Sequence, residues 1–282
     1  MSFAPTSATR VFALLGDPVA HSLSPLFQNA ALRAADLDGI YVALRTPAGH
    51  LAGVLRGLAV AGGGGNVTVP HKELAARSVD RATEAVRRTR ACNTFWLEDG
   101  EVRGDNTDVA GAGAALRALL GRAPEGARVL LVGAGGSARA VAAALSRERV
   151  GDVVVLNRTA TRAEALRADF PELRVSVARD ATELAGERFD LAVNATSVGL
   201  RPGDALPLTL DSGPRVGAAL DLVYTPDETP WVRTLRASGI PAADGIEMLL
   251  HQGAAAFERW WGRPAPLDVM RAALPARRAP GP

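Results

Sequence analysis

Residues 129–138, VLLVGAGGSA, decide the fold of the second half of the chain. A short apolar strand is predicted over 127–132 and an alanine-rich helix over 137–147, with a glycine-rich turn between them. The pattern G-x-G-x-x-G/A is typical of dinucleotide-binding turns, because its first glycine permits the turn and its second lets a pyrophosphate approach the backbone. The helix N-terminus would receive the phosphate charge. A tight turn without a ligand is the alternative. The residues predicted to bind the cofactor here are Gly133, Ala134, Gly135, Gly136, Ser137 and, at the close-packing third position, Ala138.

The residues after the next predicted strand, 152–156, indicate which dinucleotide binds. NAD sites usually carry Asp or Glu here to hold the ribose 2′-hydroxyl. This chain instead has Asn157, Arg158 and Thr159, with Arg162 one helical turn further on. Since a guanidinium suits a 2′-phosphate, we predict NADP rather than NAD as the cofactor. The alternative is that Arg158 is merely an exposed residue at a helix start.

Strands alternate with helices along the whole chain, which is typical of a parallel sheet covered on both faces. Further strands are predicted at 10–15, 39–45, 66–69, 92–97, 101–105, 173–177, 190–193 and 218–223. The glycines at 62–65 are predicted to interrupt regular secondary structure before the strand at 66–69. Further helices are predicted at 24–37, 48–60, from about 72, and at 108–120, 160–169, 181–185, 227–237, 245–260 and 266–274. The chain ends, about 1–8 and 275–282, are predicted to fray.

These elements predict an α/β protein of two lobes. Residues 1–107 and 244–282 would form an α/β substrate-binding lobe, and residues 108–243 a Rossmann-like, doubly wound lobe that binds NADP. We expect the site in a cleft between the lobes, where lobe closure would exclude water.

The composition excludes several classes of protein. The 282 residues carry a formal net charge of only +2 and show no basic patch interleaved with aromatic residues, so no nucleic-acid partner is expected. No uncharged stretch reaches the ~18 apolar residues that a membrane helix needs, and the start lacks the apolar core of a signal peptide. With Cys92 as the only cysteine, a cytoplasmic protein without an internal disulfide is expected. It could be a monomer or a homodimer.

One residue is unusually rare. Of the 32 basic residues only Lys72 is a lysine, and the chain has just six asparagines and two glutamines. Arginine cannot replace lysine where a proton must leave, because guanidinium stays charged at any working pH. Lys72 is therefore a candidate proton-transfer residue, although its survival by chance is the alternative.

Four polar clusters occupy points where a strand or loop meets a helix, the places where ligands bind in α/β folds. They are Ser22–Pro25, Asn66–Lys72, Cys92–Thr94 and Gly104–Asp108. Their hydroxyls, amides, lysine and aspartate would suit a small polyhydroxylated acid. The four histidines lack the spacing of metal ligands, so no metal is expected.

Read together, these residues resemble the shikimate dehydrogenase family. The resemblance runs in order from about residue 11 to 262. NVTxPHK combined with GxNTD is highly specific, whereas GAGG alone is not. The matching signatures are GDPVAHSLSP (16–25), NVTVPHK (66–72), CNT (92–94), GDNTD (104–108), GAGGSAR (133–139), NRT (157–159), NATSVG (194–199), DLVYTP (221–226) and DGIEMLLHQGAAAF (244–257).

The resemblance implies an oxidoreductase of the shikimate pathway to aromatic amino acids, reversibly reducing 3-dehydroshikimate to shikimate with NADPH. By motif, Lys72 and Asp108 would be the catalytic pair and would also touch the substrate, whose carboxylate Ser22 and Ser24 would hold. Thr68, Asn93 and Gln252 would hold hydroxyls, Tyr224 would help close the pocket, and the residues near the nicotinamide would be Leu222, Gly245 and Met248. Two positions depart from the family pattern: Gln28, where His is common, and Cys92, where a small apolar residue is common.

The chemistry of carbonyl reduction independently favours the roles of Lys72 and Asp108. Hydride transfer leaves charge on the carbonyl oxygen, and a cationic donor beside that oxygen stabilises the charge and supplies the proton. Asp108 would chiefly orient Lys72 and the substrate.

Three alternatives stay open. Quinate or an amino-shikimate analogue could be the substrate of the same reaction. A non-catalytic module that senses NADP or shikimate could use the same fold. A thiol enzyme could be built on Cys92, although a nucleophilic cysteine needs a partner base.

Overall fold

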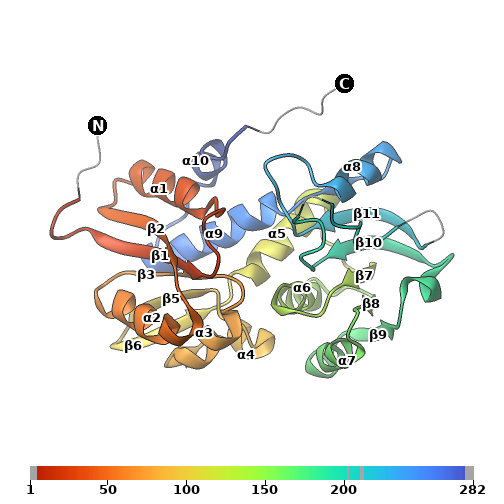
Figure 1. The fold of residues 1–282 in the computed structure, drawn as a ribbon, viewed down its shortest axis with the longest axis horizontal. Coiled ribbons are helices and arrows are strands. Elements are labelled where there is room, and N and C mark those ends of the chain that lie inside the picture. The colour runs from red at the N-terminus through yellow and green to blue at the C-terminus, as the bar shows by residue number, and fades with distance from the viewer. Residues whose placement is uncertain (1–4, 202, 210–212, 277–282) are drawn as a thin grey trace. The chain divides into compact units, whose positions relative to one another are not determined.

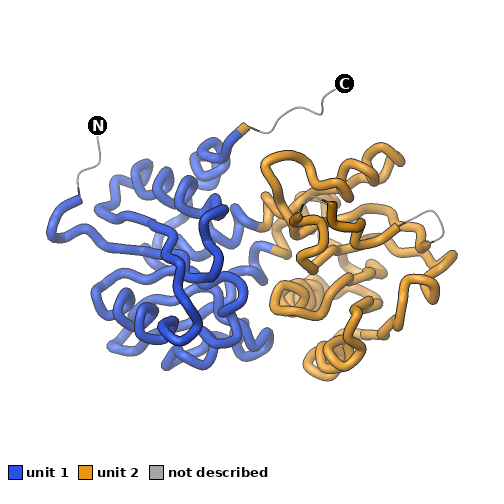
Figure 2. Tube along the Cα trace, viewed as in Figure 1, with its two compact units in different colours: residues 1–111, 249–275 blue, residues 112–248, 276–282 orange. Residues whose placement is uncertain are grey.

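The computed structural model describes residues 5–201, 203–209 and 213–276. They form two compact units, drawn in blue and orange in Figure 2: unit 1 comprises residues 1–111 and 249–275, and unit 2 residues 112–248 and 276–282. The chain passes from one unit to the other within helix α5 (Asp108–Leu120) and again within helix α9 (Ile246–Trp261).

Unit 1 is built on a mixed six-stranded sheet (Figure 1). Its first three strands along the chain pair in parallel, and an antiparallel hairpin continues the sheet. In sheet order the strands are β2 (Gly39–Arg45), β1 (Arg10–Gly16), β3 (Gly64–Val67), β5 (Thr94–Glu98), β6 (Glu101–Asp105) and β4 (Arg81–Ala82). Its helices, besides its parts of α5 and α9, are α1 (Ser24–Ala34), the 3₁₀ turn η1 (Ala48–His50), α2 (Leu51–Val60), α3 (Lys72–Ser78), α4 (Glu84–Thr89) and α10 (Leu267–Ala272).

Side chains alternate across this sheet, so each face has its own core. Ala13 and Leu15 of β1 pack with Leu51 and Leu55 of α2 on one face. Phe12, which precedes Ala13 and points to the other face, packs on Trp260 with ring centroids 4.8 Å apart. The predicted substrate-binding residues Ser22, Ser24, Thr68 and Lys72 follow the ends of strands β1 and β3.

Unit 2 is built on an all-parallel six-stranded sheet. Its strands are nearly continuous apolar runs, as expected where helices cover both faces. In sheet order they are β12 (Ala242–Ala243), β11 (Arg215–Asp221), β10 (Arg188–Asn194), β7 (Arg128–Val132), β8 (Asp152–Leu156) and β9 (Arg174–Ala178). Its helices are α6 (Gly136–Arg147), α7 (Ala160–Asp169), the 3₁₀ turn η2 (Ala181–Leu184) and α8 (Pro230–Ala237), besides its parts of α5 and α9.

The strand order of unit 2 reverses between β7 and β10. Strands β8 and β9 extend the sheet on one side of β7, and β11 and β12 extend it beyond β10. Ligands of doubly wound sheets bind at the carboxyl ends of the strands beside such a reversal. The predicted fold class, with a mixed substrate lobe and a Rossmann-like lobe, is confirmed.

Several predicted boundaries were wrong. Strand β3 runs from Gly64 to Val67 rather than over 66–69. It therefore begins inside the glycine run that was predicted to interrupt regular secondary structure. Helix α1 ends at Ala34 rather than 37, because Asp36 adopts a left-handed conformation with φ of 52°. Residues 48–50 form a 3₁₀ turn, and the short elements β4, α4 and β12 were not predicted.

The N-terminal end was also mispredicted in part. The hydroxyl of Thr9 donates to Asp38 Oδ1 over 2.6 Å, and Thr6 donates to Asp38 Oδ2 over 3.0 Å, so these residues are held on the fold. Of the predicted frayed ends, residues 1–4 and 277–282 lie outside the described residues.

The lobe boundaries predicted at 107/108 and 243/244 differ by a few residues from the edges of the compact units. Unit 1 continues to residue 111. The reason is that Asp108, the first residue of α5, bonds with side chains of unit 1.

Glycine is required where β3 runs between β1 and β5. A Cβ at Gly65 would lie 2.0 Å from the carbonyl oxygen of Ala13. This is a backbone atom fixed in the sheet, so the neighbouring strand cannot give way as a flexible side chain would. The second half of the glycine run, Gly64 and Gly65, therefore belongs to the sheet.

Replacing Gly65 by alanine is expected to lower the free energy of unfolding by about 1–3 kcal/mol or more, because the added methyl overpacks the sheet. Gly53, exposed on α2 with open space around it, is the matched control. Its replacement by alanine is expected to raise stability by about 0.5–1 kcal/mol. Urea denaturation followed by circular dichroism measures both changes. A Gly65→Ala midpoint equal to that of wild type would contradict the close approach.

Candidate active site

The carboxyl ends of three parallel strands in unit 1 share one edge of the sheet. Strands β1, β2 and β3 end at Gly16, Arg45 and Val67. The serine cluster follows β1 and the Thr68–Lys72 turn follows β3. Polar residues after adjacent parallel strands meet at such an edge.

The turn from Thr68 to Lys72 is held from both ends. The backbone N–H of Thr68 donates to Leu15 O over 2.9 Å, and that of His71 donates to Thr68 O over 2.9 Å. The buried His71 ring places Nε2 2.7 Å from Thr46 O. Because His71 is committed to this contact, it serves as a positioned loop residue. Helix α3 starts at Lys72, whose carbonyl accepts the N–H of Cys92 over 2.9 Å.

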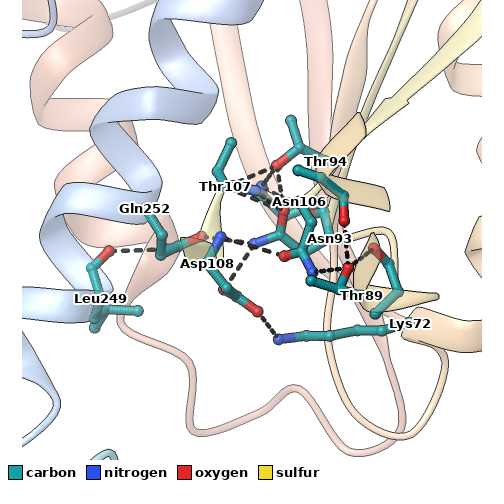
Figure 3. Close-up of polar contacts among 12 residues, drawn as sticks. Lys72, Thr89, Asn93, Thr94, Asn106, Thr107, Asp108, Leu249 and Gln252 are labelled. Atoms are coloured by element: carbon teal, nitrogen blue, oxygen red, sulfur yellow. Dashed lines mark hydrogen bonds and ion pairs between the residues drawn. The ribbon is translucent and has the colours of Figure 1, made fainter. Parts of the chain in front are cut away.

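Lys72 and Asp108 face each other directly (Figure 3). Lys72 Nζ lies 2.5 Å from Asp108 Oδ2, and the two side chains are only 16% and 6% exposed. The other carboxylate oxygen, Oδ1, accepts a hydrogen bond from Asn93 Nδ2 over 2.8 Å. Both oxygens of Asp108 are thus occupied by donors. The predicted juxtaposition of ammonium and carboxylate is confirmed.

Asn93 links Asp108 to Gln252 of α9. Asn93 Nδ2 lies 3.4 Å from Gln252 Oε1, and Gln252 Nε2 donates to Leu249 O over 2.8 Å (Figure 3). Four of the predicted site residues, Lys72, Asn93, Asp108 and Gln252, therefore form one connected group. They come from four separate segments of the sequence, and α9 returns to complete the group after the chain has passed through unit 2.

The turn before Asp108 is fixed by Asp105, which the sequence did not single out as a site residue. Asp105 Oδ1 accepts from Thr83 Oγ1 over 2.6 Å and from the N–H of Asn106 over 2.8 Å. Asp105 Oδ2 accepts from Arg259 Nε over 2.9 Å. Arg259 lies on α9, so this ion pair ties the helix of Gln252 to the turn of Asp108. Nothing in the spacing of residues 154 positions apart could have revealed it.

The other residues of unit 1 that were predicted to bind the substrate, Ser22, Ser24 and Thr68, carry hydroxyl groups. Ser22 Oγ accepts the N–H of Ser24 over 3.1 Å and can still donate. The hydroxyls of Ser24 and Thr68 make no hydrogen bond to any described residue. No hydrogen bond among the described residues joins these three side chains to Lys72, so the structure places them around the same sheet edge without connecting them to the pair.

Gln28, one of the two departures from the family pattern, is buried against α9. Its Nε2 donates to Gly253 O over 2.9 Å, next to Gln252. A Cβ at Gly253 would lie 2.4 Å from the Phe27 ring, so helices α1 and α9 approach closely here. Gln28 therefore acts in packing between the two helices.

The predicted dinucleotide turn of unit 2 has room for a ligand. Gly133, after β7, has φ of 113°, a conformation that side chains rarely adopt. Gly135 precedes α6 without a side-chain cap, and a Cβ placed there would meet nothing within 4 Å. The first N–H groups of this helix are thus left for an anion, and the turn fits a pyrophosphate.

The residues after β8 present cationic groups without partners. Arg158 and Arg162 are exposed, and within the described ranges neither side chain makes a hydrogen bond or an ion pair. Asn157 Nδ2 donates to Thr159 O over 2.8 Å, which shapes the turn. Thr159 leaves the N-terminus of α7 without a side-chain cap. This donor set fits a phosphate group.

A second polar hub lies at the carboxyl ends of β10 and β11 in unit 2. Asp221 Oδ1 accepts from Asn194 Nδ2 over 2.8 Å and from the N–H of Val223 over 3.1 Å. Asp221 Oδ2 accepts from Thr229 Oγ1 over 2.8 Å. Burial raises the pKa of the Asp221 carboxyl, and nearby Asp244 adds to the effect, while these three donors oppose it.

This hub supports the residues predicted near the nicotinamide. Leu222 and Tyr224 flank Val223, whose N–H bonds Asp221. A Cβ at Gly245 would lie 2.3 Å from Leu222 O, so only glycine fits beside this segment, and Met248 is buried one turn further along α9. Burial also raises the pKa of Tyr224, which keeps its phenol neutral and able to donate.

Within the described part of the chain, no group of three or more His, Cys, Asp or Glu side chains is placed to hold a metal ion. No described helix combines the length and apolar character needed to span a bilayer.

Comparison with protein families matches three consecutive regions of the chain. The shikimate dehydrogenase substrate binding domain matches residues 14–95, shikimate / quinate 5-dehydrogenase residues 117–199, and the shikimate 5′-dehydrogenase C-terminal domain residues 245–274.

Individual proteins match over almost the whole length. The shikimate dehydrogenase (NADP(+)) of Geobacter sulfurreducens is 41% identical over 280 residues, which cover 96% of this chain and 98% of the relative. The crystal structure of shikimate dehydrogenase from Aquifex aeolicus matches with a TM-score of 0.87 at 33% identity, covering 96% of this chain and 99% of that one. Shikimate 5-dehydrogenase from Thermus thermophilus, in complex with NADP(H) and shikimate, matches with a TM-score of 0.83 at 40% identity, covering 93% and 97%. The resemblance drawn from the sequence motifs is confirmed, and the chain belongs to the shikimate dehydrogenase family of oxidoreductases.

Proposed function

We propose that this protein catalyses the reversible, NADP-dependent interconversion of 3-dehydroshikimate and shikimate, with Lys72 and Asp108 as its catalytic pair. The observation that carries the proposal is the 2.5 Å contact between Lys72 Nζ and Asp108 Oδ2 in a largely buried setting. The Thermus thermophilus relative, 40% identical, holds NADP(H) and shikimate together. A cytoplasmic protein, monomeric or homodimeric, is part of the same proposal.

The substrate is a small acid with several hydroxyls, and unit 1 offers matching groups. Ser22 and Ser24 follow β1 with donor capacity to spare and are proposed to bind the carboxylate. Thr68, Asn93 and Gln252 are proposed to bind hydroxyls, and Tyr224 to help close the pocket. All of these groups are neutral. The position of the Lys72 ammonium would therefore determine which oxygen of the substrate reacts and at which end the carboxylate binds.

Lys72 is proposed to move the proton. In the reduction, its ammonium donates a proton to the substrate oxygen as negative charge develops there. In the oxidation, the neutral amine accepts the hydroxyl proton. Asp108 holds the amine in place through Oδ2 and is itself held by Asn93 through Oδ1.

NADPH, when bound, supplies the hydride that this proton transfer complements. Residues Gly133–Ala138 would hold its pyrophosphate at the open N-terminus of α6. Arg158 and Arg162 would hold the 2′-phosphate together with Asn157 and Thr159. Leu222, Gly245 and Met248 would lie near the nicotinamide.

Two alternatives from the sequence can be weighed further. A non-catalytic sensor of NADP or shikimate has no need for a buried ammonium–carboxylate pair, so the Lys72–Asp108 contact favours an enzyme. Quinate and amino-shikimate analogues share the hydroxyls of shikimate and use the same pair, so they remain substrates to compare by assay.

The assay that tests the proposal follows nicotinamide absorbance with shikimate or quinate, each against NADP⁺ and NAD⁺. The highest kcat/KM is expected with shikimate and NADP⁺. Binding of both ligands without turnover would favour the sensor, and faster turnover of quinate would reassign the substrate.

Replacing Lys72 by alanine is expected to lower kcat by about 10²–10⁴-fold, the usual contribution of general acid–base catalysis, with a smaller change in KM. Arg77, an exposed cation on the same helix, is the matched control, and Arg77→Ala is expected to keep the wild-type rate. Steady-state kinetics measures both variants. A Lys72→Ala enzyme that turns over at a near-normal rate would remove the proposed role.

Replacing Arg158 by alanine is expected to weaken NADPH binding by roughly 10- to 150-fold, because a charge-assisted contact is worth about 1.5–3 kcal/mol. Binding of NADH, which has no 2′-phosphate, serves as the internal control and is expected to stay the same. Fluorescence titration of both cofactors measures the difference. Unchanged NADPH affinity would show that Arg158 does not bind the phosphate.

The thiol alternative conflicts with the surroundings of Cys92. Its side chain is completely buried in the core of unit 1, and its Sγ donates to Thr94 O over 3.3 Å. Burial raises the pKa of the thiol to about 12, whereas a nucleophilic cysteine needs a stabilised thiolate.

A maleimide or disulfide reagent at pH 8 is therefore expected to leave the folded protein unmodified and fully active. The same reagent should modify one thiol per chain after denaturation, since Cys92 is the only cysteine. Mass spectrometry counts the modified thiols. Rapid modification of folded protein with parallel loss of activity would restore the thiol hypothesis.

A further inference from the structure

We propose that Thr94 and Asn66 are positioning residues for Asp108 that act through the side-chain amide of Asn93. The inference rests on the proposed function in one respect, namely that Asp108 belongs to the reacting pair. It concerns a buried hydrogen-bond chain that runs from Tyr41 to Asp108 behind the site.

The orientation of the Asn93 amide follows from the groups around it. Its Oδ1 accepts the backbone N–H of Thr107 over 2.8 Å (Figure 3). A backbone N–H can only donate, so the oxygen of the amide must face it. The nitrogen is thereby turned toward Asp108 Oδ1, 2.8 Å away. A rotated Asn93 would present an oxygen to the carboxylate instead of a donor.

Thr94 stabilises that orientation with the single hydrogen of its hydroxyl. Thr94 Oγ1 lies 2.8 Å from Asn93 Oδ1 and donates to it. The same oxygen accepts from Asn66 Nδ2 over 3.0 Å and lies 3.0 Å from Thr107 Oγ1. Asn93 Oδ1 carries no hydrogen, so the Thr94 hydroxyl supplies the one between these two oxygens, and Thr107 Oγ1 also donates to Asn93 Oδ1 over 3.1 Å.

Asn66 is oriented in turn by groups that permit only one arrangement. Its Nδ2 also donates to the backbone carbonyl of Asn93 over 3.1 Å, and a carbonyl can only accept. Its Oδ1 accepts from Tyr41 Oη over 2.8 Å. Donors therefore point in one direction along the whole chain, from Tyr41 through Asn66, Thr94 and Asn93 to Asp108.

All members of this chain are buried, which makes its order costly to disturb. Thr94 is 0% exposed and Asn93 2%, so an unmade hydrogen bond cannot be replaced by bulk water. The chain keeps a donor on Asp108 Oδ1 and leaves Oδ2 for Lys72.

The kinetic test compares Thr94→Val, which removes the hydroxyl at almost constant volume, with Thr94→Ser, which keeps it. Thr94→Val is expected to lower kcat/KM for shikimate about tenfold, with KM for NADP⁺ unchanged. Thr94→Ser, which keeps the hydroxyl, is expected to have a kcat/KM for shikimate within about twofold of that of wild type. A Thr94→Val enzyme with wild-type kcat/KM would overturn the proposal.

The same substitution in an Asn93→Ala background separates positioning from a general loss of structure. If Thr94 acts through Asn93, Thr94→Val is expected to add no further loss of kcat/KM once the amide is gone. A second loss of about tenfold on top of Asn93→Ala would show that Thr94 acts independently of Asn93, which would overturn the proposal.

The positioning of the Asn93 amide can also be measured on the wild-type protein without substrate. This measurement does not depend on whether shikimate is turned over. The side-chain NH₂ of Asn93, assigned by nuclear magnetic resonance through its own Cβ, is expected to exchange with solvent far more slowly than an exposed asparagine amide. Free exchange would overturn the positioning proposal, whereas absent shikimate turnover with a protected amide would overturn only the proposed function.

Discussion

The Lys72–Asp108 contact depends on each oxygen of a nearly buried carboxylate having a partner. Removing charged groups from water costs more than their mutual attraction returns unless the remaining hydrogen bonds are satisfied. Here Asn93 provides the second donor, and Thr107 and Thr94 hold Asn93 in place. The sheet edge of unit 1, the turn at Asp105 and the return of α9 all serve to bring these groups together. Much of the architecture of unit 1 can thus be understood as support for one ion pair.

Unit 2 uses a comparable arrangement for a different purpose. Asp221 gathers donors from Asn194, Val223 and Thr229 at the carboxyl ends of two strands. Thr229 also caps α8 by accepting from the N–H of Val232. A single carboxylate therefore joins two strands, a helix start and the segment of Leu222 and Tyr224. In both units a buried acid organises irregular backbone, which otherwise has no ladder of hydrogen bonds to hold it.

The sequence was most informative where chemistry restricts the choice of residue. The turn at Gly133, the scarcity of lysine and the motif around Asp108 led to the two-lobed fold, to Lys72 and to its partner. Scarcity was informative for the amides as well, since all eight asparagines and glutamines make side-chain hydrogen bonds in the structure. What could not be predicted depends on contacts between distant segments. Tyr41 with Asn66, and Arg259 with Asp105, carry no local pattern. Strand β3 was misplaced because glycine is usually a chain breaker, whereas close approach of neighbouring strands demands it here.

The composition that singled out Lys72 has a practical consequence. Guanidinium groups do not react with acylating or reductively alkylating reagents under mild conditions, so these reagents meet a single amine-bearing side chain among 282 residues. The amine lies beside Asp108, and 16% of the Lys72 side chain is exposed. Lys72 is therefore a single, defined position in unit 1 at which a label can be attached. An unblocked N-terminal α-amine reacts with the same reagents, so label at Lys72 would be counted on its own peptide after digestion. Any compound that shields the Lys72 amine could then be ranked by how well it slows that labelling, without a spectroscopic substrate.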